Sequence, residues 1–476
     1  MRISPTKILA PLAAFAITLL VLTALNRSDP TSQASADRQA ATSLDVRPGA
    51  GTAELIATTR RAVRAKPRDA ALRVSLGDLL YQRGRETADS AYNERAFGAY
   101  RAALRLDPRS AGATAGLATL ALAKHDFAAG RRLGHRALSF EPSSVQPYGA
   151  IVDAEIELGR YADAGRSLQR MIELKPNLAS YSRVSYWREL HGDLDGSLEA
   201  LELAISAGGG TPENVAYVET LLGNLRFQRG DLDAARAAYR AADGRVPDFL
   251  GAQVGLATVA AARGDLDTAI EGYRRAIAVS PVHEYNVLLL EAQLAAGRTG
   301  AARRTVAEIR KYQAIERRNG VDTDAELAIF EAERGSPARA VELGRSAVAT
   351  APSVASADAY SWALTSAGRG DAALTWARRA LRLGSRDPLL LYHAGMAAKT
   401  AGKPALARRW LTRALARNPR FSPLHARHAR RALRSIASSQ KRAPAVTARA
   451  SQRTRPHAAR APASPVASVV ASGSGS

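Results

Sequence analysis

The sequence predicts an all-α protein, a right-handed α-solenoid of about ten helix-turn-helix repeats. Prolines recur at a spacing of 34 residues, at Pro108, Pro142 and Pro176 and again at Pro247 and Pro281. Each of them follows an Ala-rich amphipathic segment, and aromatic residues make up only 5% of the chain. In a solenoid each repeat buries its apolar stripe against its neighbours alone, so a long surface is left free for other molecules.

The solenoid is predicted to cover residues 53–436, with a helix at each end. Residues 53–65 form an amphipathic segment that Lys66 and Pro67 end, and residues 424–436 form another. Both are expected to cap the stack, because a terminal repeat would otherwise expose an apolar face to water.

The first repeat carries extra residues. Leu76 and Gly77 lie too far before Ala96 and Tyr100 for an uninterrupted unit. The segment 85–92 between them is therefore predicted to be a protruding loop.

The clearest repeat covers residues 250–281 and divides around the turn at Gly264. Its second half places Ala269, Tyr273 and Ala276 on one face of a helix before Pro281. The preceding residues 216–247 repeat the scheme, with a large-small pair at Leu222-Gly223, a turn at Gly230, then Ala235, Tyr239, Ala242 and Pro247.

These two units resemble the tetratricopeptide repeat in the small residue of the first helix, the glycine turn, the Ala and aromatic of the second helix, and the closing proline. A glycine followed five residues later by alanine recurs in the same register at Gly159 and Ala164, Gly297 and Ala302, Gly335 and Ala340, Gly368 and Ala373, and Gly402 and Ala407. The resemblance covers about three quarters of the chain.

Two repeats depart from the pattern. The fourth ends in Gly208-Gly209-Gly210, which is interpreted as a hinge and lacks the Lys and Ser/Thr of a phosphate-binding loop. The seventh runs into the charged residues 311–320 without a closing proline.

The amino-terminal residues 1–27 are predicted to be a signal anchor or a signal peptide. Arg2 and Lys7 precede an apolar run of 18 residues, 8–25. That length is short for a bilayer span of about 20 residues and long for a cleavable core of about 7 to 15. Ala34-Ser35-Ala36 offers a distant cleavage site, so a single-pass membrane protein and a secreted protein both stay open, with the solenoid outside the cytoplasm. Residues 28–52 are predicted to be a flexible linker.

The carboxy-terminal residues 437–476 are predicted to be a disordered tail of Ala, Arg, Pro and Ser. The net charge is +23, and no acidic residue follows Asp387 while 17 Lys and Arg do, which leaves +6 (23 minus 17) for the rest. Such a tail can bind a wall polymer, an anionic lipid or, in the cytoplasm, nucleic acid; a solvated linker is the plain alternative. The residues assigned to it are Arg430, Arg431, Arg434, Lys441, Arg442, Arg449, Arg453, Arg455 and Arg460.

Nothing in the sequence predicts an enzyme, a cofactor or a metal site. The chain has no Cys, and its eight His residues form no HExxH motif. His425 and His428 are three residues apart but stand among arginines, whose charge opposes a cation, so they are interpreted as surface residues.

The resemblance implies a concave groove, lined by the first helices, that holds a peptide or a partner helix. The Lys, Asn and Arg set with which the family binds chaperone tails is not found here, so that kind of receptor is not expected. On the resemblance, the groove residues would be Asp153, Tyr186, Tyr217, Asn224, Phe227, Asp358, Trp362 and Tyr392. Packing between helices is the alternative for each ring.

Two functions follow from the sequence. The first is a non-enzymatic protein-binding scaffold, membrane-anchored or exported, that holds a protein or peptide in its groove. The alternative is an envelope-surface protein whose basic tail binds a polyanion, with the solenoid as a spacer.

Overall fold

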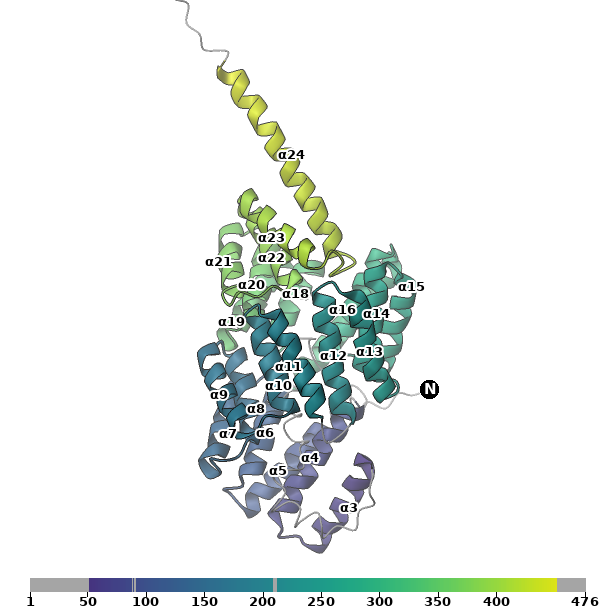
Figure 1. The fold of residues 1–476 in the computed structure, drawn as a ribbon, viewed down its shortest axis with the longest axis vertical. Helices are drawn as coiled ribbons and strands as arrows, with labels where there is room; N and C mark the ends of the chain where they lie inside the picture. Colours follow the sequence, from purple (N-terminus) through teal and green to yellow (C-terminus); the bar gives the residue numbers. More distant parts are fainter. Residues whose placement is uncertain (1–50, 88, 90, 209–211, 452–476) are drawn as a thin grey trace, which may run out of the picture.

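The computed structural model describes residues 51–451 apart from residues 88, 90 and 209–211, and for residues 440–451 the backbone alone. The described part contains 22 helices, and α4 to α23 form ten consecutive pairs in which each helix packs against the next (Figure 1). This confirms the predicted α-solenoid of about ten repeats. The apolar run 8–25 and residues 452–476 lie outside the described residues.

The ten pairs have the following bounds. They are α4 (Ala70–Thr87) with α5 (Ala91–Leu106), α6 (Ala111–Ala123) with α7 (Phe127–Phe140), α8 (Gln146–Glu157) with α9 (Tyr161–Leu174), α10 (Leu178–Leu190) with α11 (Leu194–Ala207), α12 (Pro212–Gln228) with α13 (Leu232–Arg245), α14 (Leu250–Arg263) with α15 (Leu266–Val279), α16 (His283–Ala295) with α17 (Thr299–Arg318), α18 (Asp324–Arg334) with α19 (Pro337–Thr350), α20 (Val354–Ser366) with α21 (Gly370–Ala380), and α22 (Pro388–Thr400) with α23 (Pro404–Arg417). The single helices α3 (Thr52–Ala65) and α24 (His425–Ser451) stand at the two ends.

Small residues of the first helices receive the tyrosine of the second helix. The Tyr239 ring lies between Gly223 of its own repeat and Gly255 of the next, where an added Cβ would come within 2.4 Å and 2.3 Å of the ring. Tyr100 lies in the same way between Gly77 and Gly116. One ring thus joins two successive repeats, which explains why the motif pairs glycine with tyrosine.

Second helices are capped and joined on their outer side. The side chains of Asp231 and Asp265 each accept a hydrogen bond from the third backbone N–H of the helix that follows, as their position predicts. Asp233 instead pairs with Arg263 of the following repeat at 2.5 Å. This pair is exposed, so it adds little to stability.

First and second helices differ in burial. In α8 every residue from Gly149 to Glu157 is buried, whereas α9 buries only Tyr161, Ala164, Leu168 and Met171, one stripe of the helix. First helices also contact the next first helix along the chain, as α8 does with α10 and α20 with α22. The first helices therefore form the inner layer of the solenoid, and we call their faces the inner wall.

Successive turns of the superhelix touch each other. Tyr161 accepts a hydrogen bond from the backbone N–H of Val354 at 2.7 Å, and Asn418 donates one to the carbonyl of Phe227 at 2.7 Å. These partners are 193 and 191 residues apart, so one turn takes between about five and six 34-residue repeats. The solenoid is closed, turn against turn, along its axis.

The structure corrects one local prediction. The segment 85–92 is not a protruding loop, because α4 continues through Thr87 and α5 begins at Ala91. The inserted residues extend a helix, which keeps their backbone groups hydrogen-bonded. Residues 311–318 likewise lengthen α17.

At the carboxy-terminal end, α24 continues to Ser451 and extends away from the body in Figure 1. Residues 437–451, which the sequence assigns to a disordered tail, are therefore helical, since Ala and Arg favour helix. Among the described residues, no helix has the length and apolar character needed to cross a membrane.

Candidate functional site

The inner wall brings three groups of polar and aromatic side chains together. Each group centres on first helices of the repeats, and the second lies where one superhelical turn meets the next. The eight residues that the resemblance assigns to a groove are distributed over these groups.

The first group surrounds Asp153 on α8. Both carboxylate oxygens of Asp153 accept hydrogen bonds from Arg183 on α10, at 2.9 Å and 2.8 Å, and both side chains are fully buried. Tyr186, one helical turn further along α10, is 6% exposed. Asp153 is thus fully engaged by a neighbouring repeat.

The second group lies on α12. Tyr217 is buried, while Asn224 is exposed and accepts a hydrogen bond from the Tyr239 hydroxyl at 2.8 Å. Phe227 is partly buried, and its carbonyl holds Asn418 of the next turn.

At the end of α12, Gln228 bridges two acids across the same junction. Its amide donates to Glu189 at 3.0 Å and to Asp387 at 2.8 Å. Burial, and then the nearby Asp387, raises the pKa of Glu189 to about 7. Two acids of different turns therefore share one neutral amide as their donor.

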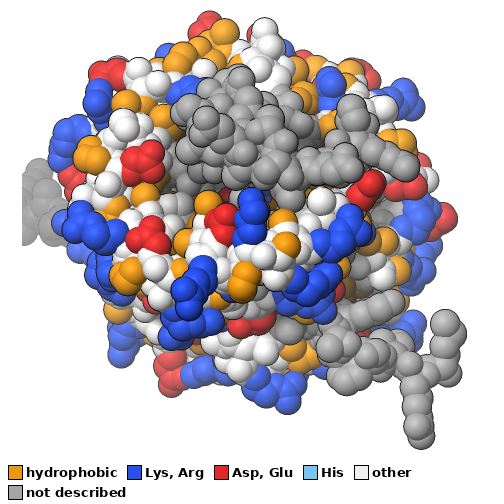
Figure 2. Space-filling model, turned by 90° about the horizontal axis from the view of Figure 1, so that it is seen from below, with side chains coloured by type: hydrophobic (Ala, Val, Ile, Leu, Met, Phe, Trp, Pro, Cys, Tyr) orange, Lys and Arg blue, Asp and Glu red, His pale blue; other side chains and the backbone are white. Residues whose placement is uncertain are grey.

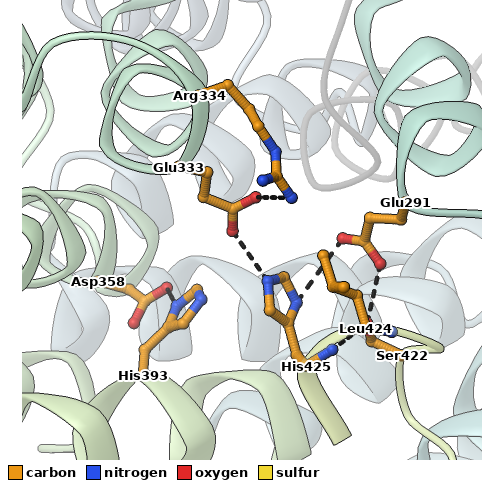
Figure 3. Close-up of polar contacts among 8 residues, drawn as sticks. All are labelled: Glu291, Glu333, Arg334, Asp358, His393, Ser422, Leu424 and His425. Atoms are coloured by element: carbon orange, nitrogen blue, oxygen red, sulfur yellow. Dashed lines mark hydrogen bonds and ion pairs between the residues drawn. The ribbon is translucent and has the colours of Figure 1, made fainter. Parts of the chain in front are cut away.

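The third group brings Asp358, Trp362 and Tyr392 together around two histidines, His393 and His425. Figure 3 shows Asp358 beside these two histidines. Asp358 lies 2.7 Å from Nδ1 of His393, and the Trp362 ring stacks on the His393 ring at 4.3 Å between centroids. Tyr392 stacks on His425 at 5.1 Å. Three of the predicted groove residues thus converge, and they do so on histidines that the sequence analysis did not single out for this role.

His425 holds α24 to the body. Its Nε2 lies 3.0 Å from Glu333 of α18, and its Nδ1 lies 3.7 Å from Glu291 of α16 (Figure 3). Burial lowers the pKa of His425, but Glu291 and Glu333 outweigh that effect and raise it above its usual value. The interpretation of His425 as a surface residue is wrong, because it is 5% exposed.

The role of this cluster is structural, because its ion pairs and hydrogen bonds hold the start of α24 against α16 and α18. The Ser422 hydroxyl donates a hydrogen bond to the carboxylate of Glu291 at 2.8 Å, and not to a histidine. Within the part of the chain that the structure describes, no group of three or more His, Asp or Glu side chains has a geometry suited to a metal ion.

The sequence could not have revealed Glu291, Glu333 and His393 as one cluster with His425. They stand in four different repeats or caps, and each lies on a helix whose pattern is explained by packing alone. The curvature of the superhelix over about four repeats brings α16, α18 and α24 together.

Comparison with known families agrees with this architecture. Residues 220–284, which cover most of repeat 216–247 and all of repeat 250–281, match the tetratricopeptide repeat model. Together with the ten helix pairs this makes the chain a tetratricopeptide-repeat protein. No curated protein matches the sequence significantly.

Solved structures with similar helical arrays have low sequence identity. A thermophilic tetratricopeptide-repeat protein of Thermus thermophilus is 21% identical, covering 40% of this chain and 98% of its own, with a TM-score of 0.36. The Cut9-Hcn1 hetero-tetramer of APC/C is 14% identical over 89% of this chain and 99% of its own, with a TM-score of 0.37. Yeast Tom70 is 13% identical over 80% and 99%, with a TM-score of 0.35.

Proposed function

We propose that this protein is a non-enzymatic scaffold whose inner wall binds a basic segment of a partner protein. One observation carries the proposal: the chain has a net charge of +23, yet its inner wall gathers carboxylates. Glu157, Glu189, Glu284 and Glu326 all lie on first helices, and burial raises the pKa of each.

Charge and ring chemistry together favour a basic peptide. Buried acids without a cation are costly, so a Lys or Arg of a partner gains from pairing with them. Trp362 is partly exposed and adds aromatic surface on the same wall, and such rings carry much of the energy of protein interfaces, whereas Tyr392 is buried behind it. Positive charge on the outer surface repels a basic segment and so would also help to direct it to the inner wall. Lys and Arg side chains are spread over the end of the molecule in Figure 2, with fewer acidic ones.

The proposal is tested with defined peptides of matched length, basic, neutral and acidic, titrated against the full-length protein by fluorescence anisotropy. Neutralising both acids at the turn junction, with Glu189→Gln and Asp387→Asn, is expected to weaken the binding of basic peptides about 30-fold, since each of the two charge pairs is worth on the order of 1 kcal/mol. The matched control neutralises exposed outer acids, Glu199→Gln and Glu202→Gln. Equal loss in both variants, or no preference for basic peptides, would reject the inner wall as the binding surface.

We further propose that the scaffold is tethered to, or exported across, a membrane by residues 8–25, as their apolar run and basic flank favour. Protease added to intact cells tests this, with the solenoid followed by immunoblot. Digestion supports an extracytoplasmic solenoid, and protection until lysis contradicts it.

The second candidate is binding of a polyanion through the carboxy-terminal tail. It is favoured by the absence of acids after Asp387 and by α24, which extends from the body and exposes Arg431 and Arg434. Removal of residues 437–476 should abolish binding to an anionic polymer. Binding by the intact chain should also fall on the order of 10³-fold between about 50 and 200 mM salt if roughly six charges are neutralised. Binding that persists after removal of the tail, or that stays unchanged at the higher salt concentration, excludes this second function.

A further inference from the structure

A cavity of about 60 Å³ lies where α7 and α8 of one superhelical turn meet α18, α19 and α20 of the next. Its polar side is made by Glu157, Glu326 and His125, and its apolar side by Phe127 and alanines of α18, α19 and α20. The volume corresponds to roughly four to six water-sized positions.

The acids of this cavity have no cationic side chain paired with them among the described residues. Glu157 is 7% exposed, and its described partner is the neutral Ser353 hydroxyl. Burial and then the nearby acids Asp322 and Asp324 raise the pKa of Glu326, and His125 opposes this effect. A buried carboxylate in such a place gains strongly from a counter-charge.

His125 supplies an independent sign of an incomplete site. The side chain is 7% exposed, and its Nδ1 is hydrogen-bonded to the carbonyl of Asp322, but its buried Nε2 has no hydrogen-bond partner. Its backbone adopts φ +59°, a left-handed conformation that residues other than glycine seldom adopt. Strain of this kind is often retained where a side chain must be aimed at a ligand.

We propose that this cavity is a receptor for a single Lys or Arg side chain of a partner protein, with the cationic head between Glu157 and Glu326 and the methylene stem against Phe127 and the alanines. The apolar and acidic halves of the cavity match the two halves of such a side chain. The proposal rests on the proposed scaffold function, because the cationic side chain that fills the cavity belongs to a bound partner protein.

The occupant would join two superhelical turns. His125 and Glu157 belong to one turn, and Glu326 with the start of α20 belongs to the next. A bound side chain therefore clamps α8 against α18 and stabilises the closed solenoid, since a ligand that binds only the folded form raises its stability.

Burial, relieved in part by Ser353 and reinforced by Glu326, raises the pKa of Glu157 to about 7. Glu157 therefore carries a proton in part of the molecules at neutral pH. A cation that enters displaces it, so binding is expected to release protons, which calorimetry in buffers of different ionisation enthalpy detects.

The test titrates full-length protein, labelled at histidine for NMR, with N-acetyl-arginine and N-acetyl-lysine methylamides. The expected result is a saturable shift of the His125 resonance at millimolar concentration, with N-acetyl-citrulline methylamide, the neutral analogue, at least tenfold weaker. Glu157→Gln and Glu326→Gln should each weaken binding of the two basic probes at least tenfold, while the exposed control Glu308→Gln should leave their binding unchanged. Ala355→Leu keeps both acids but fills the cavity, and it should also prevent binding.

Equal binding of the citrulline analogue, or unchanged binding in the Gln variants, would overturn the proposal. A third probe, spermidine, separates the sources of the cation: binding more than tenfold tighter than the capped residues would assign the cavity to a free polyamine and also overturn it. The acids tested here differ from Glu189 and Asp387. Loss of peptide binding along the wall and loss of cation binding in the cavity can therefore be told apart.

Discussion

Asp153 and Arg183 form the most deeply buried ion pair of the molecule's described part, with both side chains fully inaccessible. Removing one member of such a pair leaves the other charge in the interior without a partner. Asp153→Ala is therefore expected to lower the free energy of unfolding by about 3–5 kcal/mol, measured by urea denaturation. Glu173→Ala is the control, since its pair with Arg170 is exposed and should be worth less than about 1 kcal/mol. Equal effects would mean that Asp153 is not buried with Arg183.

Glu157 makes stability depend on pH. Its pKa rises from the usual 4.5 to about 7 in the folded protein, so between these values the folded state binds a proton that the unfolded state has lost. The proton on Glu157 makes its full contribution to the free energy of unfolding below about pH 4.5. That contribution, at most about 3 kcal/mol, is lost as the pH rises through 7. Glu157→Gln should therefore flatten the fall in melting temperature between pH 5 and pH 8 in calorimetric scans. His283 acts in the opposite direction, because burial lowers its pKa to about 4 and its contribution is lost as the pH falls. An unchanged profile in the Gln variant would place Glu157 in water.

At the scale of helices, the stack depends on tyrosine rings that lie on glycines. Gly223→Ala would put a methyl group 2.4 Å from the Tyr239 ring, so we expect a loss of about 1–3 kcal/mol. Gly98→Ala is the matched control in the interior of α5, where an added Cβ meets nothing within 4 Å, and it should stabilise by roughly 0.5–1 kcal/mol. Opposite signs in thermal melts confirm the ring contact, and a stabilising Gly223→Ala contradicts it.

The elements could be predicted from the sequence because each repeat is a local unit. The Ala and Tyr of residues 250–281 have a helical spacing, and Gly264 ends a helix in the left-handed conformation that favours glycine. The segment 85–92 could not be placed, because its residues fit either a loop or a longer helix. Packing of α4 on α5 decides in favour of the helix.

The candidate site could be predicted only in part. Trp362 and Tyr392 were assigned to a peptide groove on the family resemblance; their rings lie 5.6 Å apart, and their role in binding stays a prediction. Their partners could not be found, since His425 and Glu291 meet through the pitch of the superhelix. That pitch sums small rotations over many repeats, and no single segment of sequence determines it.

For the whole molecule, the central claim is that successive superhelical turns close on each other. Closure buries the junctions at Tyr161 and Asn418, creates the cavity beside Glu157, and brings the acids of separate turns together. An open solenoid of the same repeats would have none of these. Both the inner-wall proposal and the cavity proposal depend on this geometry.

Cross-linking between turns tests that claim most directly. The chain has no native Cys, so Gln228→Cys with Asp387→Cys introduces the only two thiols, at side chains that are 2.8 Å apart in space and 159 residues apart in sequence. Treatment of the native full-length protein with a short bismaleimide is predicted to give an intramolecular product in high yield. Each single variant and the urea-unfolded double variant serve as controls and should not give it. If both thiols react singly while no internal link forms, the turns do not touch and the closed solenoid is contradicted.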